Sequence, residues 1–454
     1  MHTPSSPFPE SVKATEQGLV ARLRGVLARH RGPLAALVVR ISAAGLAYVL
    51  QITIARYLGA DEYGVFAYAW AWVQIGGFAA TFGLSQIAVR FLAEYSQRNE
   101  TALAVGFIRF SLLAVTVGAG LVGLAGLYWL NGHPDAFGQE FHKSLMLMFV
   151  TVPLFALGDL AEGYARSHGW SMLALAPPYI LRQALMVLAV PAAWAVGFPA
   201  TATLAMTVAL GATALSTLLQ LIMTLRRLIP AGASPITATY ALRDWLVAAW
   251  PVFLGDVAQV LRQNVDIIVL AMYVEPHLIA LYFAATRIAS ILGLIEFAVG
   301  AAAAHRFARV DANTSSAELT MLVRQTCHLT FWPTLIGALI ICALAPLILT
   351  LFGEAYAAAA PVVYILAAGY TFRALIGPAE ELLIMRGFGR SAMLSQFIGL
   401  EMTVIMAWQY VPQIGVLGAA LGHFGAQFAT TIMLAFCCRK LTGALPLPLP
   451  TKTS

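Results

Sequence analysis

The sequence predicts an all-α integral membrane protein with about twelve transmembrane helices, arranged as two pseudo-repeated halves of six helices around a central cavity. Hydrophobic residues make up 60% of the 454 residues and charged residues only 11%, against about 25% in a typical globular protein. The apolar residues form continuous runs of about 20 residues or more, the length that a helix needs to cross the hydrocarbon of a bilayer. Basic residues concentrate in alternate loops between these runs, as they do on the cytoplasmic side of membrane proteins.

The N-terminal segment, residues 1–33, is predicted to be cytoplasmic. Within it, residues 18–32 interleave leucines with Arg22, Arg24, Arg29 and Arg31, which predicts a basic amphipathic helix suited to an anionic inner leaflet. A plain basic flank of the first span explains the same residues equally well.

Twelve predicted spans follow in order: 34–57, 62–89, 101–130, 145–166, 173–196, 199–224, 244–273, 277–305, 321–351, 357–385, 392–411 and 414–437. One set of alternate loops holds nearly all the basic residues, such as Arg226, Arg227 and Arg243, whereas the other set includes the acidic pair Asp61 and Glu62. The positive-inside rule therefore places both termini in the cytoplasm.

The spans divide six and six at a loop that contains two prolines. This predicts an N-terminal half at 34–225, a cytoplasmic linker at 226–243, a C-terminal half at 244–438 and a cytoplasmic proline-containing tail at 439–454. Shifting the second half back by about 216 positions places Tyr273 on Tyr57, which is a modest sign of an internal repeat. Repeated halves are common in transporters, whose substrate sites lie at the interface between them.

The seventh span carries the clearest candidate site. Asp256, Gln259, Arg262, Gln263 and Asp266 fall within an arc of roughly 120° at 100° per residue. We expect this face to line an aqueous cavity, with the two glutamines as polar lining. Local pairing of Arg262 with Asp266, four residues apart, is the competing explanation.

Arginines within the spans suggest an anionic substrate, because paired guanidinium groups suit phosphate and pyrophosphate. The predicted substrate-binding residues are Arg182, Arg262, Arg287 and Arg373. Alternatively, each neutralises a carboxylate of a neighbouring span, such as Asp266, Glu296 or Glu380. The carboxylates Asp256, Asp266 and Glu380 are candidates for gating or ion coupling, and the lone His423 is more readily explained as a packing residue than as a proton relay.

Motifs of soluble enzymes are missing: the sequence has no phosphate-binding glycine loop, dinucleotide fingerprint, paired metal histidines or nucleophile elbow. We therefore expect no cofactor, no metal and no enzymatic activity. The net charge of +6 is spread between apolar runs, so we expect no nucleic-acid partner.

The first hairpin carries a family resemblance. Its charged turn lies between two apolar runs, and its distinctive residues are Arg56, Tyr57, Gly59, Glu62, Tyr63, Gly64 and Arg90. The pattern resembles the first hairpin of bacterial polysaccharide and oligosaccharide flippases, such as those for O-antigen, in the multidrug/oligosaccharidyl-lipid/polysaccharide exporter superfamily. These matching residues are expected to be architectural.

The resemblance implies a flippase that moves polyprenyl-pyrophosphate-linked oligosaccharide from the inner to the outer leaflet by alternating access, for O-antigen, capsule or exopolysaccharide assembly. Its partners would be this glycan, membrane lipids, and the glycan polymerase and glycosyltransferases of the pathway.

Three other functions remain open at this stage. A cation-coupled multidrug extruder of the same superfamily would need an acidic site in the first spans, which the sequence lacks. A flippase for the peptidoglycan precursor would resemble a fourteen-span design. A membrane-embedded glycan polymerase or ligase would carry a large periplasmic loop, whereas the longest predicted outer loop, 131–144, is short.

Overall fold

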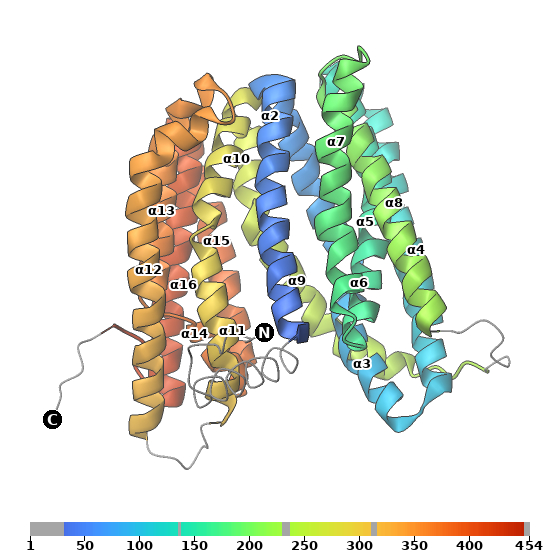
Figure 1. Cartoon of the computed structure of the whole chain (residues 1–454), viewed down its shortest axis with the longest axis vertical. Coiled ribbons are helices and arrows are strands. Elements are labelled where there is room, and N and C mark those ends of the chain that lie inside the picture. Colours follow the sequence, from blue (N-terminus) through green and yellow to red (C-terminus); the bar gives the residue numbers. More distant parts are fainter. Residues whose placement is uncertain (1–30, 135–137, 229–236, 310–315, 449–454) are drawn as a thin grey trace, which may run out of the picture.

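The computed structural model describes residues 31–134, 138–228, 237–309 and 316–448, and the regular elements of these ranges are all helices (Figure 1). Those of the first half of the chain are α2 (Arg31–Ala79), α3 (Leu84–Arg98), α4 (Thr101–Gly132), α5 (Gln139–Ser167), α6 (Ser171–Ala176), η2 (Pro177–Leu181), α7 (Arg182–Ala195) and α8 (Ala202–Leu228). The others are α9 (Leu242–Ala271), α10 (Pro276–Ser290), α11 (Gly293–Arg309), α12 (Ser316–Thr350), η3 (Glu354–Ala359), α13 (Ala360–Ala374), α14 (Ala379–Met385), α15 (Gly389–Ile414) and α16 (Val416–Thr442). Nearly all of the predicted N-terminal basic helix and much of the linker lie outside the described residues.

The number of membrane crossings agrees with the sequence prediction. Ten described helices are long and apolar enough to span a membrane, and the bent pair α2–α3 makes eleven. Gly59 interrupts α2 with φ 77° and ψ 174°, a backbone conformation that residues other than glycine rarely adopt. Because the chain turns there into the second arm of the predicted hairpin, α2 contributes one further crossing, and the prediction of about twelve helices is confirmed.

Several predicted spans are broken rather than continuous. The second span stops at Ala79 and resumes at Leu84, after Phe82 and Gly83 both take positive φ. A side chain at Gly83 would collide with the backbone of α9 at Ala249, so glycine permits the close approach of the two helices. The eighth span breaks between α10 and α11, and the tenth between α13 and α14.

Backbone chemistry explains the interruption of the tenth span and a further irregularity in the fifth. At the tenth span, Gly377 has φ 53° and precedes Pro378, whose ring disfavours a helical conformation in the residue before it. In the fifth span, Pro177 and Pro178 open the π-helical turn η2, because each proline removes one backbone donor.

The helices form two groups, α3–α8 on one side and α10–α16 on the other, with α2 between them in Figure 1. The helix α9 joins the groups. Near its start, Trp245 donates a hydrogen bond to the hydroxyl of Tyr95 on α3 (2.8 Å), whereas near its end Asp266 accepts one from Tyr282 on α10 (2.5 Å).

The two ends of the bundle differ in how the core is built. We call the end at which α2 begins and α16 ends the terminal end, and the end that contains Gly59 the hairpin end. At the hairpin end, one apolar cluster runs through both groups and includes Tyr63, Phe66, Phe283 and Phe352. At the terminal end, each group has a separate cluster.

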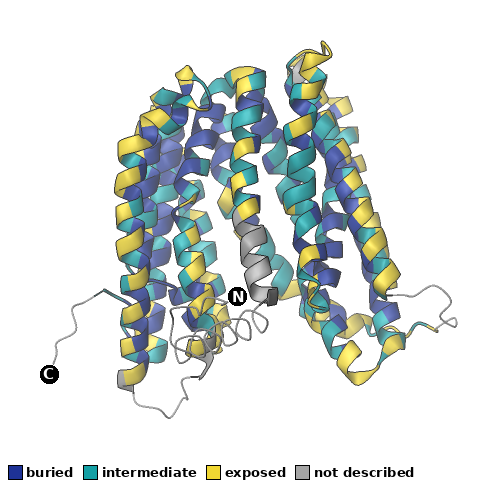
Figure 2. Ribbon diagram, in the orientation of Figure 1, coloured by how far each residue is buried: buried dark blue, intermediate teal, exposed yellow. Residues whose placement is uncertain are grey.

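The outward faces of the helices are apolar and exposed, whereas buried residues lie within the bundle (Figure 2). Leu113 and Leu124 of α4, Leu188 of α7 and Leu347 of α12 are 65–70% exposed. Such a surface suits contact with lipid, as expected for a multi-pass membrane protein.

Candidate functional site

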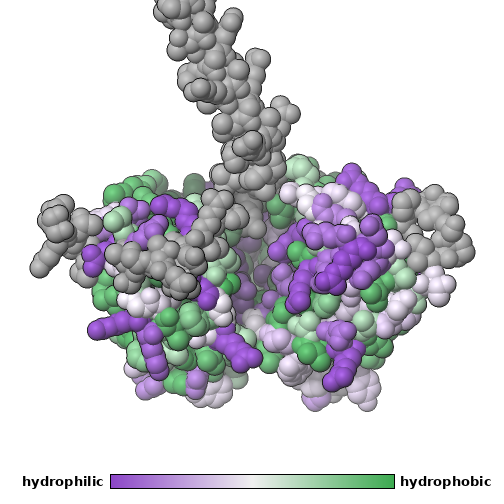
Figure 3. Space-filling view, turned by 90° about the horizontal axis from the view of Figure 1, so that it is seen from below, coloured by the Kyte–Doolittle hydropathy of each residue, from purple (hydrophilic) through white to green (hydrophobic). Residues whose placement is uncertain are grey.

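A polar pocket of about 480 Å³ lies among α9, α10, α11 and α13 to α16, and Gln74 of α2 completes its wall. Seven predicted site residues line it: Gln259, Arg262, Gln263, Asp266, Arg287, Arg373 and Glu380. Two others, Arg182 and Asp256, are not in the lining. Viewed from the terminal end, the molecule is hollowed between the two groups of helices (Figure 3).

The predicted polar arc of α9 contributes four of these residues, and Asp256 lies outside because of the path of the helix. The start of α9 packs against α3 and α4, where Trp245 contacts Phe107 with ring centroids 5.2 Å apart. Only the second half of α9 reaches the pocket.

Two arginines of the pocket form no ion pair with a described residue, although Glu380 acts electrostatically on Arg262, and Asp266 on Arg287, from farther away. Within the described chain, the Nε atoms of Arg262 and Arg287 are buried without a hydrogen-bond partner, and neither side chain forms an ion pair. The guanidinium of Arg287 lies 4.3 Å from the centre of the Phe283 ring. Pairing of Arg262 with Asp266, the alternative suggested by their spacing, does not occur in this structure.

Arg373, by contrast, is neutralised by carboxylates of other helices, which is the alternative that the sequence left open for these arginines. Its guanidinium lies 2.8 Å from a carboxylate oxygen of Glu296 on α11 and 3.8 Å from one of Glu380 on α14. It also donates to the carbonyl of Gly377 (3.2 Å), in the break between α13 and α14. Arg373 is only 6% exposed, and its contacts link α13 to α11 and α14, the helices that follow the two breaks.

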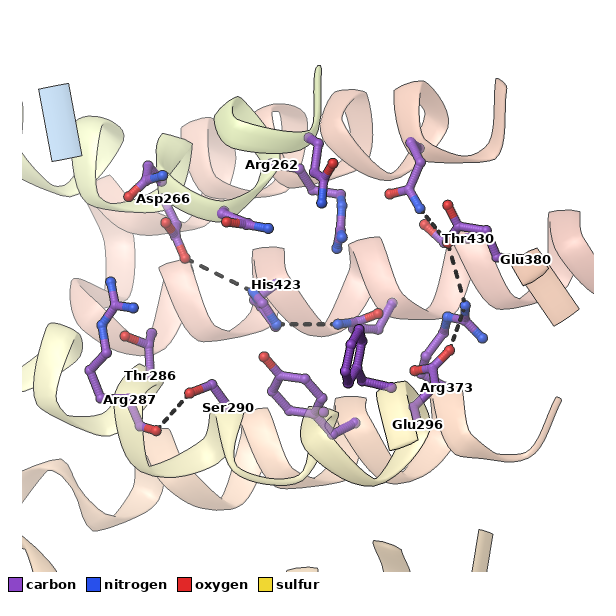
Figure 4. Close-up of a pocket in the computed structure, with 18 of the residues that line it drawn as sticks. Arg262, Asp266, Thr286, Arg287, Ser290, Glu296, Arg373, Glu380, His423 and Thr430 are labelled. Atoms are coloured by element: carbon purple, nitrogen blue, oxygen red, sulfur yellow. Dashed lines mark hydrogen bonds and ion pairs between the residues drawn. The ribbon is translucent and has the colours of Figure 1, made fainter. Parts of the chain in front are cut away.

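A buried acid and an imidazole lie toward the other end of the pocket (Figure 4). Asp266 accepts hydrogen bonds from the Tyr282 hydroxyl (2.5 Å) and the Ile267 backbone N–H (2.9 Å). The Nδ1 atom of His423 on α16 is 4.0 Å from the same carboxylate, and its Nε2 is 3.4 Å from the side-chain nitrogen of Gln427.

Arg182 lies on the other group of helices, away from the pocket. It follows η2 directly, and its guanidinium stacks 5.3 Å from the ring centres of both Trp70 and Phe155. Its predicted contact with substrate stays a prediction, as does the role of Asp256.

Three residues of the family motif, all on α2, contact helices of the α10–α16 group at the hairpin end. Arg56 donates to the carbonyls of Leu351 (2.6 Å) and Thr350 (3.1 Å) at the end of α12. The Tyr63 ring lies 5.8 Å from that of Phe283, and a side chain at Gly64 would collide with the carbonyl oxygen of Pro276.

The other motif residues make contacts in the α3–α8 group or shape the turn. Tyr57 packs edge-on against Trp194, Glu62 accepts a hydrogen bond from the backbone N–H of Ala202 (2.6 Å), and Arg90 lies over Phe91. Gly59 forms the turn itself.

Comparison with protein families decides the identity. Residues 30–310 match the family described as polysaccharide biosynthesis protein. The chain belongs to this family. A search of curated proteins returns no match.

Solved structures share the fold of this polysaccharide biosynthesis family member at low identity. An inward-facing multidrug resistance MATE transporter of the MOP superfamily is 16% identical with a TM-score of 0.69, covering 90% of this chain and 98% of its own. The lipid II flippase MurJ in an inward closed conformation is 15% identical with a TM-score of 0.70, covering 89% and 87%. An outward-facing MATE transporter of the MOP superfamily is 14% identical with a TM-score of 0.62, covering 90% and 94%. The family match confirms the resemblance of the first hairpin to proteins of polysaccharide biosynthesis, and the solved structures show that the fold is shared.

Sequence reasoning did not assign several residues that line the pocket of this family member. The sequence suggests Glu296 only as a partner for an arginine and favours a packing role for His423 over a proton relay, and it does not single out Tyr370 or Gln427. The Gly377–Pro378 pair was the available signal for a broken helix, beside which such polar groups gather. Among the described residues, no group of three potential metal ligands is found.

Proposed function

We propose that the protein translocates polyprenyl-pyrophosphate-linked oligosaccharide from the inner to the outer leaflet of the bacterial inner membrane, for surface polysaccharide assembly. The observation that carries this proposal is the pair of arginines, Arg262 and Arg287, that line the pocket and form no ion pair among the described residues.

Intramembrane arginines that form no ion pair favour binding of an anionic ligand. A charge at the centre of a bilayer costs at least about 2.5 kcal/mol, so intramembrane arginines are normally paired or face an aqueous cavity. A diphosphate offers oxygens that accept paired, charge-assisted hydrogen bonds from guanidinium groups. Membership of a polysaccharide biosynthesis family supports a glycan attached to such a group.

The glycan would occupy the polar surfaces of the pocket. Gln259 and Gln263 on α9 are exposed and carry both donors and acceptors, as sugar hydroxyls require. A cavity of about 480 Å³ suits the diphosphate and the first sugar, with the rest of the oligosaccharide in the hollow between the helix groups. The polyprenyl tail would stay in the lipid, against the apolar outer faces.

Alternating access follows from the difference between the two ends. With both termini in the cytoplasm, the hollow at the terminal end opens to the cytoplasm and the hairpin end closes the outer side. Glycosyltransferases would supply the substrate, and a polymerase would consume it.

The test uses a strain that lacks this gene, in which lipid-linked oligosaccharide is quantified on each leaflet. We expect completed units to accumulate on the inner leaflet, the native gene to restore surface polysaccharide, and Arg262→Ala or Arg287→Ala to fail. Arg98→Ala is the matched control, because Arg98 is 62% exposed and pairs with Glu94 on its own helix. Normal glycan with raised drug sensitivity would instead indicate a multidrug extruder, and single units accumulating outside would indicate a polymerase.

A further inference from the structure

Asp266 and His423 form an acid–imidazole pair in the same pocket as the two unpaired arginines. The Asp266 side chain is 4% exposed and that of His423 14% exposed, and they come from different helices, α9 and α16. In Figure 4 their side chains point toward one another, and both line the cavity that also contains Arg262 and Arg287.

The charge of this pair depends on how many protons it binds. Within the described chain, the only basic side chain within 4.0 Å of the Asp266 carboxylate is His423, which is cationic only when protonated. Without a proton the pair carries one negative charge, with one proton it is neutral overall, and with two it carries one positive charge. Burial disfavours the charged forms of both side chains, and nearby charges shift the balance between these forms. The number of protons that the pair binds therefore depends on the charges around it.

Charged and titratable groups around the pair come from three helices, α9, α10 and α13. Arg262 lies on α9, Tyr282 and Arg287 on α10, and Tyr370 on α13, with its ring 5.7 Å from that of His423. The surrounding lining from α15 and α2, Gln396 and Gln74, is uncharged.

The far end of the pocket carries no excess of positive charge. It holds one cation, Arg373, against the three carboxyl groups of Glu296, Glu380 and Glu381, which gives a net charge of −2 when all three are ionised. The two guanidinium groups that form no ion pair in the described chain act on the acid–imidazole pair itself, Arg262 on His423 and Arg287 on Asp266. While the pocket holds no anion, their charge opposes a second proton on the pair. An anion bound between them reverses this effect.

We propose that Asp266 and His423 form a proton-binding site linked to the anion site of Arg262 and Arg287, so that a diphosphate group and a proton bind the pocket together. This inference rests on the proposed function, because it takes the ligand to be an isoprenoid-linked diphosphate. Linkage is reciprocal: an anion that favours proton binding is itself bound more tightly when the proton is present. The bound proton offsets part of the negative charge that must cross the membrane interior.

The experiment measures proton uptake when an isoprenyl diphosphate, farnesyl diphosphate, binds to the full-length protein in lipid nanodiscs. Calorimetry at one pH in two buffers of different ionisation enthalpy gives the number of protons taken up. We expect up to about one proton per ligand, so that Kd rises by at most about tenfold per pH unit over the range in which the pair titrates. Affinity therefore falls as the pH rises through that range.

Two variants separate the pair from the ligand's own titration. His423→Gln removes the imidazole, and Asp266→Asn removes the acid while keeping an oxygen that accepts from Tyr282. Both should bind farnesyl diphosphate with a proton uptake reduced to that of the ligand alone. His133→Gln is the matched control, because His133 lies exposed at the hairpin end and bonds to the carbonyl of Trp129.

The outcomes distinguish the two proposals. If the wild-type protein does not bind farnesyl diphosphate, both the proposed function and this inference are contradicted. Binding without proton uptake, or with the same uptake in both variants as in the wild type, would overturn the linkage and leave the proposed function in place. If one variant fails to fold, the other still decides the question.

Discussion

The hairpin end and the terminal end of the bundle hold the two groups of helices in different ways. At the hairpin end, a shared apolar core and direct contacts from Arg56, Tyr63 and Gly64 join the groups. At the terminal end, the cores are separate, and the polar pocket and its ion pairs lie among α9, α10, α11 and α13 to α16. We infer that the motif of the first hairpin closes one side of the membrane while the polar residues of the other group bind substrate.

The largest expected effect comes from breaking the ion pairs of the terminal end. Arg373→Gln leaves Glu296 and Glu380 without their cation, and removing one partner of a buried ion pair costs about 3–5 kcal/mol. We expect a marked fall in the unfolding free energy of the purified protein in detergent, measured by thermal or chemical unfolding.

The double variant Glu296→Gln with Arg373→Gln provides the control. It removes both charges of the closest contact, so its loss should be smaller than the sum of the two single losses. Strict additivity would show that this contact does not stabilise the wall of the pocket.

At the hairpin end, Gly64→Ala should separate α2 from α10. The new methyl group would collide with the backbone at Pro276, and overpacking of this kind costs about 1–3 kcal/mol. We expect lower thermal stability, together with faster labelling of a cysteine introduced at the turn near Gly59. Gly45→Ala on the same helix is the matched control, since a methyl group there meets nothing within 4 Å and should be neutral or stabilising. Equal behaviour of the two variants would contradict a close contact at Gly64.

Arg56→Gln sharpens the same comparison without a steric clash. It removes the charge of the donor in the hydrogen bonds to the Thr350 and Leu351 carbonyls. A hydrogen bond from a charged donor contributes about 1.5–3 kcal/mol when it is buried. We expect a smaller contribution here, because Arg56 is exposed. The distance between spin labels on α2 and α12 at the hairpin end should become more broadly distributed. An unchanged distribution, equal to that of Arg98→Gln, would show that Arg56 does not hold the ends together.

The smallest expected effect concerns the helix that joins the groups. Trp245→Phe keeps the buried ring of α9 but loses its hydrogen bond to Tyr95, worth about 0.5–1.5 kcal/mol. We expect a small loss of stability by thermal unfolding, with no change in the affinity for farnesyl diphosphate. A large loss of affinity would show that the start of α9 also shapes the pocket.

The sequence carried enough information for the architecture and for part of the site. Long apolar runs and alternating basic loops predicted the crossings, because both follow from the solvent properties of the bilayer. The arc on α9 correctly grouped Arg262 with Asp266, since positions on one helix are fixed by its geometry. Arg373 and Glu380 come within 3.8 Å of each other across the break between α13 and α14.

What the sequence could not provide was the tertiary placement of individual charges. Arg182 lies as deep in its span as Arg287 does, yet it stacks on Trp70 of α2 and Phe155 of α5, and only helix packing determines this. The break between α10 and α11 has no proline, so no local signal separated Glu296 from the helix before it. Pairing of Arg373 with Glu296 joins residues 77 positions apart, which no local rule predicts.

The most direct test of the central claim is a flipping assay with the purified protein in proteoliposomes that contain a fluorescent polyprenyl-diphosphate-linked sugar. The account predicts that the wild-type protein exposes the lipid on the opposite leaflet to a membrane-impermeant quencher. The double variant Arg262→Gln with Arg287→Gln should do so no faster than empty liposomes, whereas Arg98→Gln should match the wild type. Equal rates for the double variant and the wild type would contradict a cationic pocket as the route of the diphosphate.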